Sequence, residues 1–228
     1  MHPREGDIYA SAPLQRLLEA QTRALTADLQ RCVGSHALLL AAALGDVPPA
    51  LPMLGCWARL YLAHGGYRGD LQATPDEPLP FIDDAFELVL MRHVLERARH
   101  TSALLDEAMR VLAPGGVLVL SGVHPVSGWS PWVHWRARGE PVALQLPLQL
   151  RRHLLQAGMA IERLSRVGSL LPGMISRDDA ASALLGGGYV LIARKQRRLV
   201  TPLRIRPASV QVAASGRLSP GTRRQSAR

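Results

Sequence analysis

The side chains that could do chemistry near neutral pH are concentrated in the middle of the chain. The histidines there could act as general bases, because the pKa of histidine lies near neutrality. These histidines are His93, His100, His124 and His134. No two of them have the spacing that places two metal ligands on one face of a helix. The neighbouring carboxylates flank proline and phenylalanine, as in a solvated loop: Asp76, Glu77, Asp83 and Asp84. We therefore expect no metal centre.

Several reaction classes are excluded by residue types that are scarce. Of the 27 basic residues only Lys195 is a lysine, and Gln196 follows it, so the Gly-Lys-Ser/Thr of a phosphate-binding P-loop is absent. The same lysine stands in a run of arginines near the end of the chain, which argues against a Schiff base. No Gly-x-Ser-x-Gly nucleophile elbow occurs. Two cysteines, Cys32 and Cys56, form neither a disulfide framework nor a cysteine-rich zinc site.

Charge divides the chain into two parts. The net charge of +9 comes entirely from residues 195–228, which carry nine basic and no acidic residues, while residues 1–194 are balanced. We expect residues 1–198 to form one domain and residues 199–228 to be a disordered basic tail, able at most to bind nucleic acid weakly. The longest apolar run is too short for a membrane span and the N-terminus lacks a secretory signal, so we expect a cytoplasmic, reduced protein.

The clearest structural pattern lies in the middle of the chain. A short apolar run at 87–91 predicts a buried strand, a helix beginning at Thr101 or Ser102 follows, and 117–121 predicts the next strand. Pro114-Gly115-Gly116 is expected to end the helix. Strand, helix and strand within this length form a crossover unit and imply a parallel sheet.

Other segments are patterned less strongly. We expect an amphipathic helix at 13–31, a strand at 189–193 and a loop between 64 and 80. Residues 36–45 are apolar enough for a buried strand, but their alanines and leucines favour a helix. The remaining expected elements are a weak strand at 57–63, a helix at 148–157, a weak strand at 159–167 and a short helix at 178–185.

Residues 68–129 carry five motifs in a characteristic order: Leu79-Pro80-Phe81, Asp83–Leu90, His93–Glu96, Glu107–Leu112 and Pro114–Gly116. This stretch resembles the class I S-adenosylmethionine-dependent methyltransferases and, within them, the type 11 group. Gly122–Pro125, with Ser127 and Trp129, looks like the Gly-Phe-Asn-Pro-x-Ser-x-Trp segment of a bacterial group of such proteins. The resemblance implies an α/β fold with a Rossmann-like, mostly parallel sheet of seven strands, the last antiparallel, and an added N-terminal helix.

The same resemblance implies a cofactor site for S-adenosylmethionine. Asp70 matches the residue whose carboxylate accepts from the adenine amino group, and Leu71 matches the neighbour whose N–H reaches the ring. Met91 and Arg92 match the segment that faces the methionine part, and Gly45 ends the candidate first strand. His124 follows the strand at 117–121 and is a candidate base, although the bacterial group has asparagine there.

One motif of the family is missing. The first strand should end in Asp/Glu-x-Gly-x-Gly-x-Gly, but Val47-Pro48-Pro49 follows Gly45-Asp46. The acidic residue that holds the ribose hydroxyls is also missing from 61–65, so the first two strands are expected to be reduced. Three hypotheses follow: a methyltransferase with an unidentified acceptor, a non-catalytic binding or scaffold protein of the same fold, or a nucleic-acid-associated protein recruited by its tail. The tryptophans fit an acceptor pocket, a lid or a partner surface: Trp129, Trp132 and Trp135.

Overall fold

The computed structural model describes residues 7–63, 66–74, 77–137, 141–173 and 186–197. The helices are η1 (Ile8–Ala10), α1 (Ala12–Leu29), η2 (Val94–Glu96), α2 (Thr101–Val111), α3 (Trp129–Ala137) and α4 (Pro147–Gln156). The strands are β1 (Gly34–Ala41), β2 (Leu54–Ala63), β3 (Gly66–Gly69), β4 (Phe86–Arg92), β5 (Leu112–Val123), β6 (Met159–Val167) and β7 (Gly188–Lys195). The helix expected at 178–185 and the tail at 199–228 lie outside the described residues.

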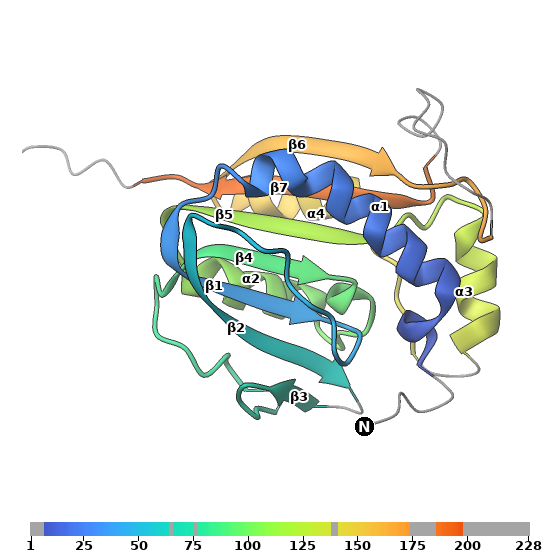
Figure 1. Ribbon diagram of the computed structural model, residues 1–228, viewed down its shortest axis with the longest axis horizontal. Coiled ribbons are helices and arrows are strands. Elements are labelled where there is room, and N and C mark those ends of the chain that lie inside the picture. Colours follow the sequence, from blue (N-terminus) through green and yellow to red (C-terminus); the bar gives the residue numbers. More distant parts are fainter. Residues whose placement is uncertain (1–6, 64–65, 75–76, 138–140, 174–185, 198–228) are drawn as a thin grey trace, which may run out of the picture. The chain divides into compact units, whose positions relative to one another are not determined.

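The strands form one seven-stranded sheet in the order β3-β2-β1-β4-β5-β7-β6 (Figure 1). Strands β2, β1, β4 and β5 run parallel, and β7 is antiparallel to β5, as expected. β1 is central: its Leu39 pairs with Arg59 of β2 on one side and Leu90 of β4 on the other. This two-sided pairing outweighs the helical preference of its alanines and leucines. With eight and ten residues, β1 and β2 are not reduced, so that expectation was wrong.

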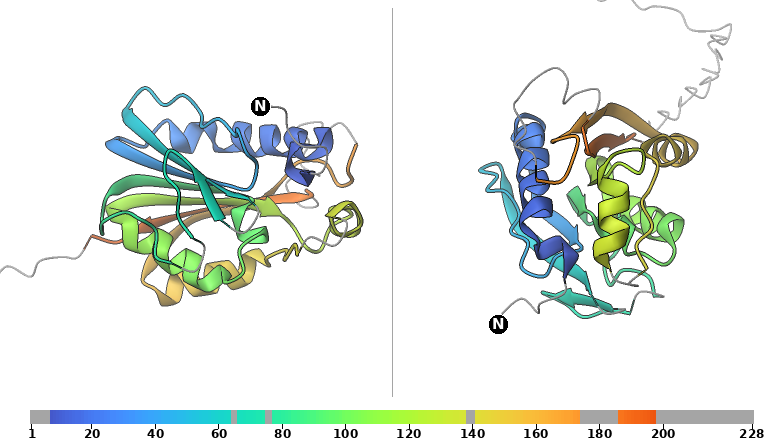
Figure 2. Two further views of the ribbon diagram at one scale, coloured as in Figure 1. Left: turned by 90° about the horizontal axis from the view of Figure 1, so that it is seen from below. Right: turned by 90° about the vertical axis from the view of Figure 1, so that its right-hand side faces the viewer.

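Helices cover the sheet on both faces, α1 on one and α2 and α4 on the other (Figure 2). Leu25 and Leu29 of α1 pack on side chains of β1, β4, β5 and β7. Leu105 and Ala108 of α2 and Leu154 of α4 pack on the opposite face. Both faces of the central parallel strands are therefore buried. This explains why the sequences of these strands are continuous apolar runs.

β3 departs from a parallel sheet. It follows β2 almost directly and pairs with it antiparallel, from Leu60 opposite Gly69 to Ala63 opposite Gly66. The sequence predicted a loop here, because glycine punctuates the segment. Gly69 lies at φ 149°, and a Cβ on it would stand 2.1 Å from the carbonyl oxygen of Arg59. Glycine is thus required by the close approach of the two strands.

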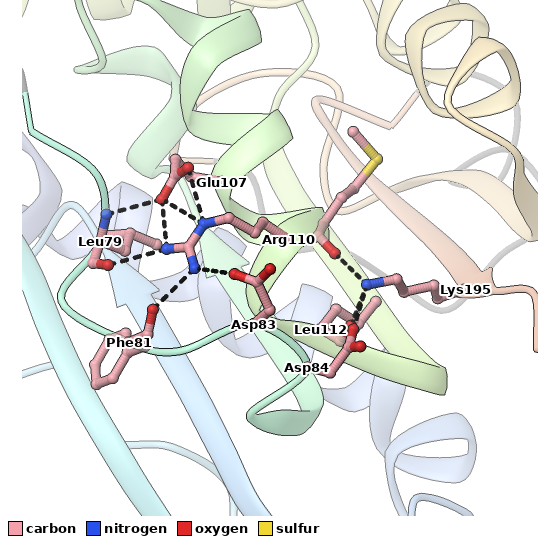
Figure 3. Close-up of polar contacts among 9 residues, drawn as sticks. Leu79, Phe81, Asp83, Asp84, Glu107, Arg110, Leu112 and Lys195 are labelled. Atoms are coloured by element: carbon pink, nitrogen blue, oxygen red, sulfur yellow. Dashed lines mark hydrogen bonds and ion pairs between the residues drawn. The ribbon is translucent and has the colours of Figure 1, made fainter.

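The segment that leads from β3 to β4 is held by Arg110 of α2 (Figure 3). Its guanidinium donates to the carbonyls of Leu79 and Phe81 at 3.0 and 2.9 Å and pairs with the carboxylates of Asp83 and Glu107. Glu107 also accepts from the N–H of Leu79 at 2.9 Å. The Leu-Pro-Phe and acidic motifs therefore anchor this segment to the helix.

Lys195, the single lysine of the chain, ends β7 beside the carboxyl end of α2 (Figure 3). Its ammonium donates to the carbonyls of Met109 and Leu112 and pairs with Asp84 at 2.7 Å. A cation at a helix carboxyl end interacts favourably with the helix dipole. The expectation that Pro114-Gly115-Gly116 ends the helix was wrong by a few residues, because α2 stops at Val111 and these residues begin β5.

Candidate functional site

The carboxyl ends of the parallel strands form the edge at which open α/β sheets bind ligands. Ala41 at the end of β1 lies opposite Arg92 at the end of β4, and Arg92 lies opposite Ser121 of β5. The segments just after these strands therefore come together. Figure 1 shows α3 and the start of α1 beyond the arrowheads of β1 and β4.

A buried ion pair joins two of these segments. The guanidinium of Arg92 lies 2.8 Å from a carboxylate oxygen of Asp46, and the two side chains are only 4% and 6% exposed. The guanidinium also donates to Thr22 of α1 at 3.2 Å and to the carbonyl of Val47 at 3.3 Å. Burial raises the pKa of Asp46, and the charge of Arg92 opposes that rise.

Next to this pair lies a cluster of hydrogen-bonded polar residues, here called the edge cluster: Tyr9, Gln21, His93 and Glu96. His93 has a left-handed backbone, φ 54°, which turns its ring between two partners. One ring nitrogen lies 3.1 Å from Glu96 and the other 3.0 Å from the side-chain oxygen of Gln21. Tyr9 donates to the second oxygen of Glu96 at 2.9 Å, and burial together with that carboxylate raises the pKa of Tyr9.

The edge cluster is also tied to the sheet. Gln21 donates to the carbonyl of Gly122 at 2.9 Å, and Glu96 accepts from the N–H of Val123. Both residues lie at the end of β5. Since Tyr9 and Gln21 come from η1 and α1, the N-terminal elements extend across the carboxyl edge and bond to β5 there.

An apolar layer covers the edge cluster from outside. It consists of side chains from the N-terminal elements, the end of β1 and α3: Ile8, Tyr9, Leu14, Leu17, Ala42, Ala43, Val123, Trp129, Val133 and Ala137. Trp129 is buried and donates from its indole nitrogen to the carbonyl of Ser169 at 2.9 Å. Trp135 is 73% exposed. Of the roles considered for the tryptophans, Trp129 fits a cover over the edge and not an open pocket floor.

The cavity between the ends of β1 and β4 is very small. The cavity between Tyr9, Asp46, Arg92 and His93 measures about 10 Å³. Ligand sites of small molecules enclose roughly 300–1,000 Å³. The chain's own side chains therefore leave no room for S-adenosylmethionine in this cavity between the ends of β1 and β4.

The other predicted cofactor residues lie in different settings. Asp70, just after β3, lies beside Arg59, which is inside β2 and four residues before the end of that strand. Both carboxylate oxygens of Asp70 accept hydrogen bonds from the guanidinium or the backbone N–H of Arg59. Arg59 holds the pKa of Asp70 below its usual range. Leu71 is exposed, Met91 is buried in the core and Gly45 forms a turn at φ 86°. Of the residues predicted to bind the cofactor, only Arg92 has a charged group between the ends of β1 and β4.

His124 follows β5, as predicted, but its ring is already engaged. Its Nδ1 accepts from the N–H of Val126 at 3.1 Å, so the neutral ring carries its proton on Nε2. Burial, with a smaller effect from Arg166, lowers the pKa of His124. The one basic nitrogen of the neutral ring is thus hydrogen-bonded within the loop, which does not support its role as a general base.

A larger groove lies between α2 and the β2–β3 hairpin, beside the carboxyl end of β2. It measures about 640 Å³, and Leu62, Tyr67 and Leu104 line its apolar part. Burial raises the pKa of Tyr67 to about 12, and Glu107 adds to the effect. Of the predicted acidic loop, Asp83 and Asp84 pair with Arg110 and Lys195. The part of the chain that the structure describes contains no group of three potential metal ligands.

Sequence reasoning missed the edge cluster, although one signal was present. Gln21 occupies a position on the apolar face of α1, with Leu17 four residues before it and Leu25 four residues after it, and it is fully buried. A glutamine on such a face must find buried partners. Glu96 is 1% exposed, but its sequence position gave no sign of this burial. It belongs to the His93–Glu96 motif, which was interpreted only as part of the family resemblance.

Comparison with known proteins agrees with this architecture. Residues 57–120 match the family model described as a methyltransferase domain. Over these residues the chain is similar to type 11 methyltransferase domains. The resemblance of residues 68–129 to this group is thereby confirmed, as is the class I fold. A search of curated protein sequences found no match.

Solved structures share the fold at low sequence identity. One comes from the complex of the Haloferax volcanii Trm112 methyltransferase activator with a candidate methyltransferase, at 16% identity and a TM-score of 0.55, covering 86% of this chain and 100% of the other. Another is an S-adenosylmethionine-dependent methyltransferase from Mesorhizobium loti, at 17% identity and a TM-score of 0.51, covering 78% and 100%. These similarities concern the fold alone.

Proposed function

We propose that this chain is a non-catalytic protein of the methyltransferase fold that acts by binding or as a scaffold, without S-adenosylmethionine. The observation that carries the proposal is the filled carboxyl edge. The Arg92–Asp46 pair and the edge cluster stand where the fold would hold its cofactor, around a cavity of about 10 Å³. The absence of the Gly-x-Gly-x-Gly motif from residues 45–49 supports the same conclusion.

The energy of the buried contacts also opposes opening of this edge. A ligand would have to separate Arg92 from Asp46 or displace Tyr9 and Gln21 with the start of α1. Breaking a buried ion pair costs about 3–5 kcal/mol when one charge is left without a partner. Each buried hydrogen bond that is left unmade adds about 1–3 kcal/mol. A cofactor would have to offset these costs from its own contacts.

A thermal-shift titration tests this proposal. A ligand that binds only the folded state stabilises it by about 2.7 kcal/mol at a concentration a hundred times its dissociation constant. S-adenosylhomocysteine at millimolar concentration should leave the melting temperature of the full chain unchanged. The nucleoside adenosine, at the same concentration, controls for non-specific effects. A saturable rise with S-adenosylhomocysteine, absent with adenosine, would contradict the proposal.

A second candidate is an S-adenosylmethionine-dependent methyltransferase acting on an unidentified acceptor. The family match at residues 57–120 favours it. In that case the edge would open, Asp70 and Leu71 would hold the adenine, and Gly45, Met91 and Arg92 would line the rest of the site. Asp70→Ala should then weaken S-adenosylhomocysteine by about 1–3 kcal/mol, the cost of one charge-assisted hydrogen bond. Calorimetry on the wild type and this variant separates the two candidates.

A further inference from the structure

The groove between α2 and the β2–β3 hairpin is large enough to hold a small molecule. Its volume of about 640 Å³ lies within the roughly 300–1,000 Å³ that small-molecule sites enclose. Its apolar part consists of buried side chains from both walls: Leu62, Tyr67, Leu79 and Leu104. A ligand in the groove would therefore cover apolar surface.

The carboxylates that line the groove are either engaged with the chain or exposed to solvent. Glu107 pairs with Arg110 at 2.8 Å, as Figure 3 shows. Asp106 lies 2.8 Å from a ring nitrogen of His153. Glu77 is exposed. Among the described residues, the buried part of the groove thus contains no carboxylate that needs a ligand to balance its charge.

One buried hydrogen-bond donor of the groove is left without an acceptor. Tyr67 of β3 is only 4% exposed, and its hydroxyl has no hydrogen-bond partner among the described residues. Burial, together with the charge of Glu107, raises the pKa of Tyr67 to about 12, so the phenol keeps its proton at neutral pH. Because an unpaired buried donor is costly, such a group usually has a partner. A ligand oxygen in the groove would supply one.

The amino end of α2 provides further donors at the same groove. His100, which precedes the helix, gives no side-chain cap, and its carbonyl accepts only from the N–H of Leu104. The N–H groups of Thr101, Ser102 and Ala103 have no acceptor among the described residues. His100 and Ala103 line the groove. Since a helix carries partial positive charge at its amino end, an anion is favoured there.

We infer that this groove binds a small apolar oxo acid, a carboxylate whose apolar body carries a carbonyl oxygen. The two kinds of donor belong to opposite walls, Tyr67 to the hairpin and the N–H groups to α2, so a ligand between the walls satisfies them with two separate acceptors. The carboxylate lies at the amino end of α2, where Arg99 adds positive charge, and the carbonyl accepts from Tyr67. Such an oxo acid is the ligand class of the proposed binding function, on which this assignment rests.

Isothermal titration calorimetry of the full chain with three probes of similar size provides the test. Benzoylpropionate carries the carboxylate and the carbonyl, phenylbutyrate lacks the carbonyl, and phenylbutylamine has an ammonium in place of the carboxylate. We expect saturable binding of benzoylpropionate at one site per chain, about tenfold weaker binding of phenylbutyrate, and no saturable binding of the amine at millimolar concentration. S-adenosylhomocysteine is titrated separately, so a failure with the oxo acid is distinguishable from a failure of the proposed function.

Two variants place the oxo acid in the groove. Tyr67→Phe keeps the ring and removes the hydroxyl, so it should weaken benzoylpropionate about tenfold and leave phenylbutyrate unchanged. Ala103→Trp adds a large side chain at an exposed position that lines the groove and should abolish binding. Ser102→Trp, at the exposed neighbouring position outside the lining, is the matched control and should bind as the wild type does.

Several results would overturn the inference. They are the absence of saturable benzoylpropionate binding, equal affinities for benzoylpropionate and the amine, an equal effect of Tyr67→Phe on the two acids, and equal binding by the two tryptophan variants. Displacement of benzoylpropionate by adenosine would also overturn it, because the groove would then belong to a nucleoside. The three probes on the wild type decide the matter even where a variant does not fold.

Discussion

Replacing Arg92 with methionine removes one half of the buried ion pair and keeps a side chain of similar length. Asp46, whose side chain is only 6% exposed, would then lose its charged partner. An uncompensated buried charge costs about 3–5 kcal/mol. For a domain of this size each kcal/mol lowers the melting temperature by about 2–4 °C, so we expect a fall of roughly 10 °C.

The pH dependence of this loss has a definite sign. Burial raises the pKa of Asp46 even in the presence of Arg92, and removal of the guanidinium takes away the opposing effect. A carboxyl whose pKa is higher in the folded than in the unfolded state favours folding where it is protonated, and that stability is lost as pH rises through the folded-state pKa. The deficit of Arg92→Met should therefore be smaller at mildly acidic pH than at neutral pH.

Urea denaturation of three variants provides the measurement. Arg59→Met removes an exposed partner of Asp70 and serves as the matched control, because exposed ion pairs contribute about 0–1 kcal/mol. The double variant Asp46→Leu/Arg92→Met should recover most of the loss, since apolar residues can replace a buried pair at little cost. Equal losses for Arg92→Met and Arg59→Met, or no recovery in the double variant, would refute the reasoning.

Further predictions concern the segments around α2 and the basic tail. Arg110 holds the pKa of Glu107 below its usual 4.5, so the stability from this contact is lost as pH falls through the folded-state pKa; Glu107→Gln should flatten the fall in melting temperature below pH 4.5. Lys195→Met should cost about 1–2 kcal/mol in urea unfolding, because it removes a cation from the carboxyl end of α2. Deleting residues 199–228 should abolish any low-salt affinity for duplex DNA, which in the intact chain should fall by about 0.9 log units per neutralised phosphate per decade of salt. Equal affinity with and without the tail would exclude the nucleic-acid hypothesis.

Much of the fold could be predicted where local pattern and tertiary packing agree. The strand at 87–91, the helix between Thr101 and Pro114 and the strand at 189–193 were confirmed within a few residues. Their apolar periodicity reflects burial on the same faces that the sheet and helices cover. The helix expected at 13–31 was likewise found at Ala12–Leu29.

Other features depended on contacts that are distant in sequence. β3 forms because Gly69 permits a close approach to Arg59 of β2. From its glycine content alone, the same segment is predicted to be a loop. α3 contains the three tryptophans, and its weak amphipathic pattern gave no helix prediction. The edge cluster joins residues up to 87 positions apart, as Tyr9 and Glu96 show, so no local pattern could predict it.

The central claim is that the chain's own side chains fill the cofactor position of the methyltransferase fold. Isothermal titration calorimetry of the full wild-type chain with S-adenosylhomocysteine tests it most directly. The account predicts no saturable heat at millimolar ligand, where even a dissociation constant of about 1 mM would register. Saturable binding with one site per chain would contradict it and would establish an edge that opens for its cofactor.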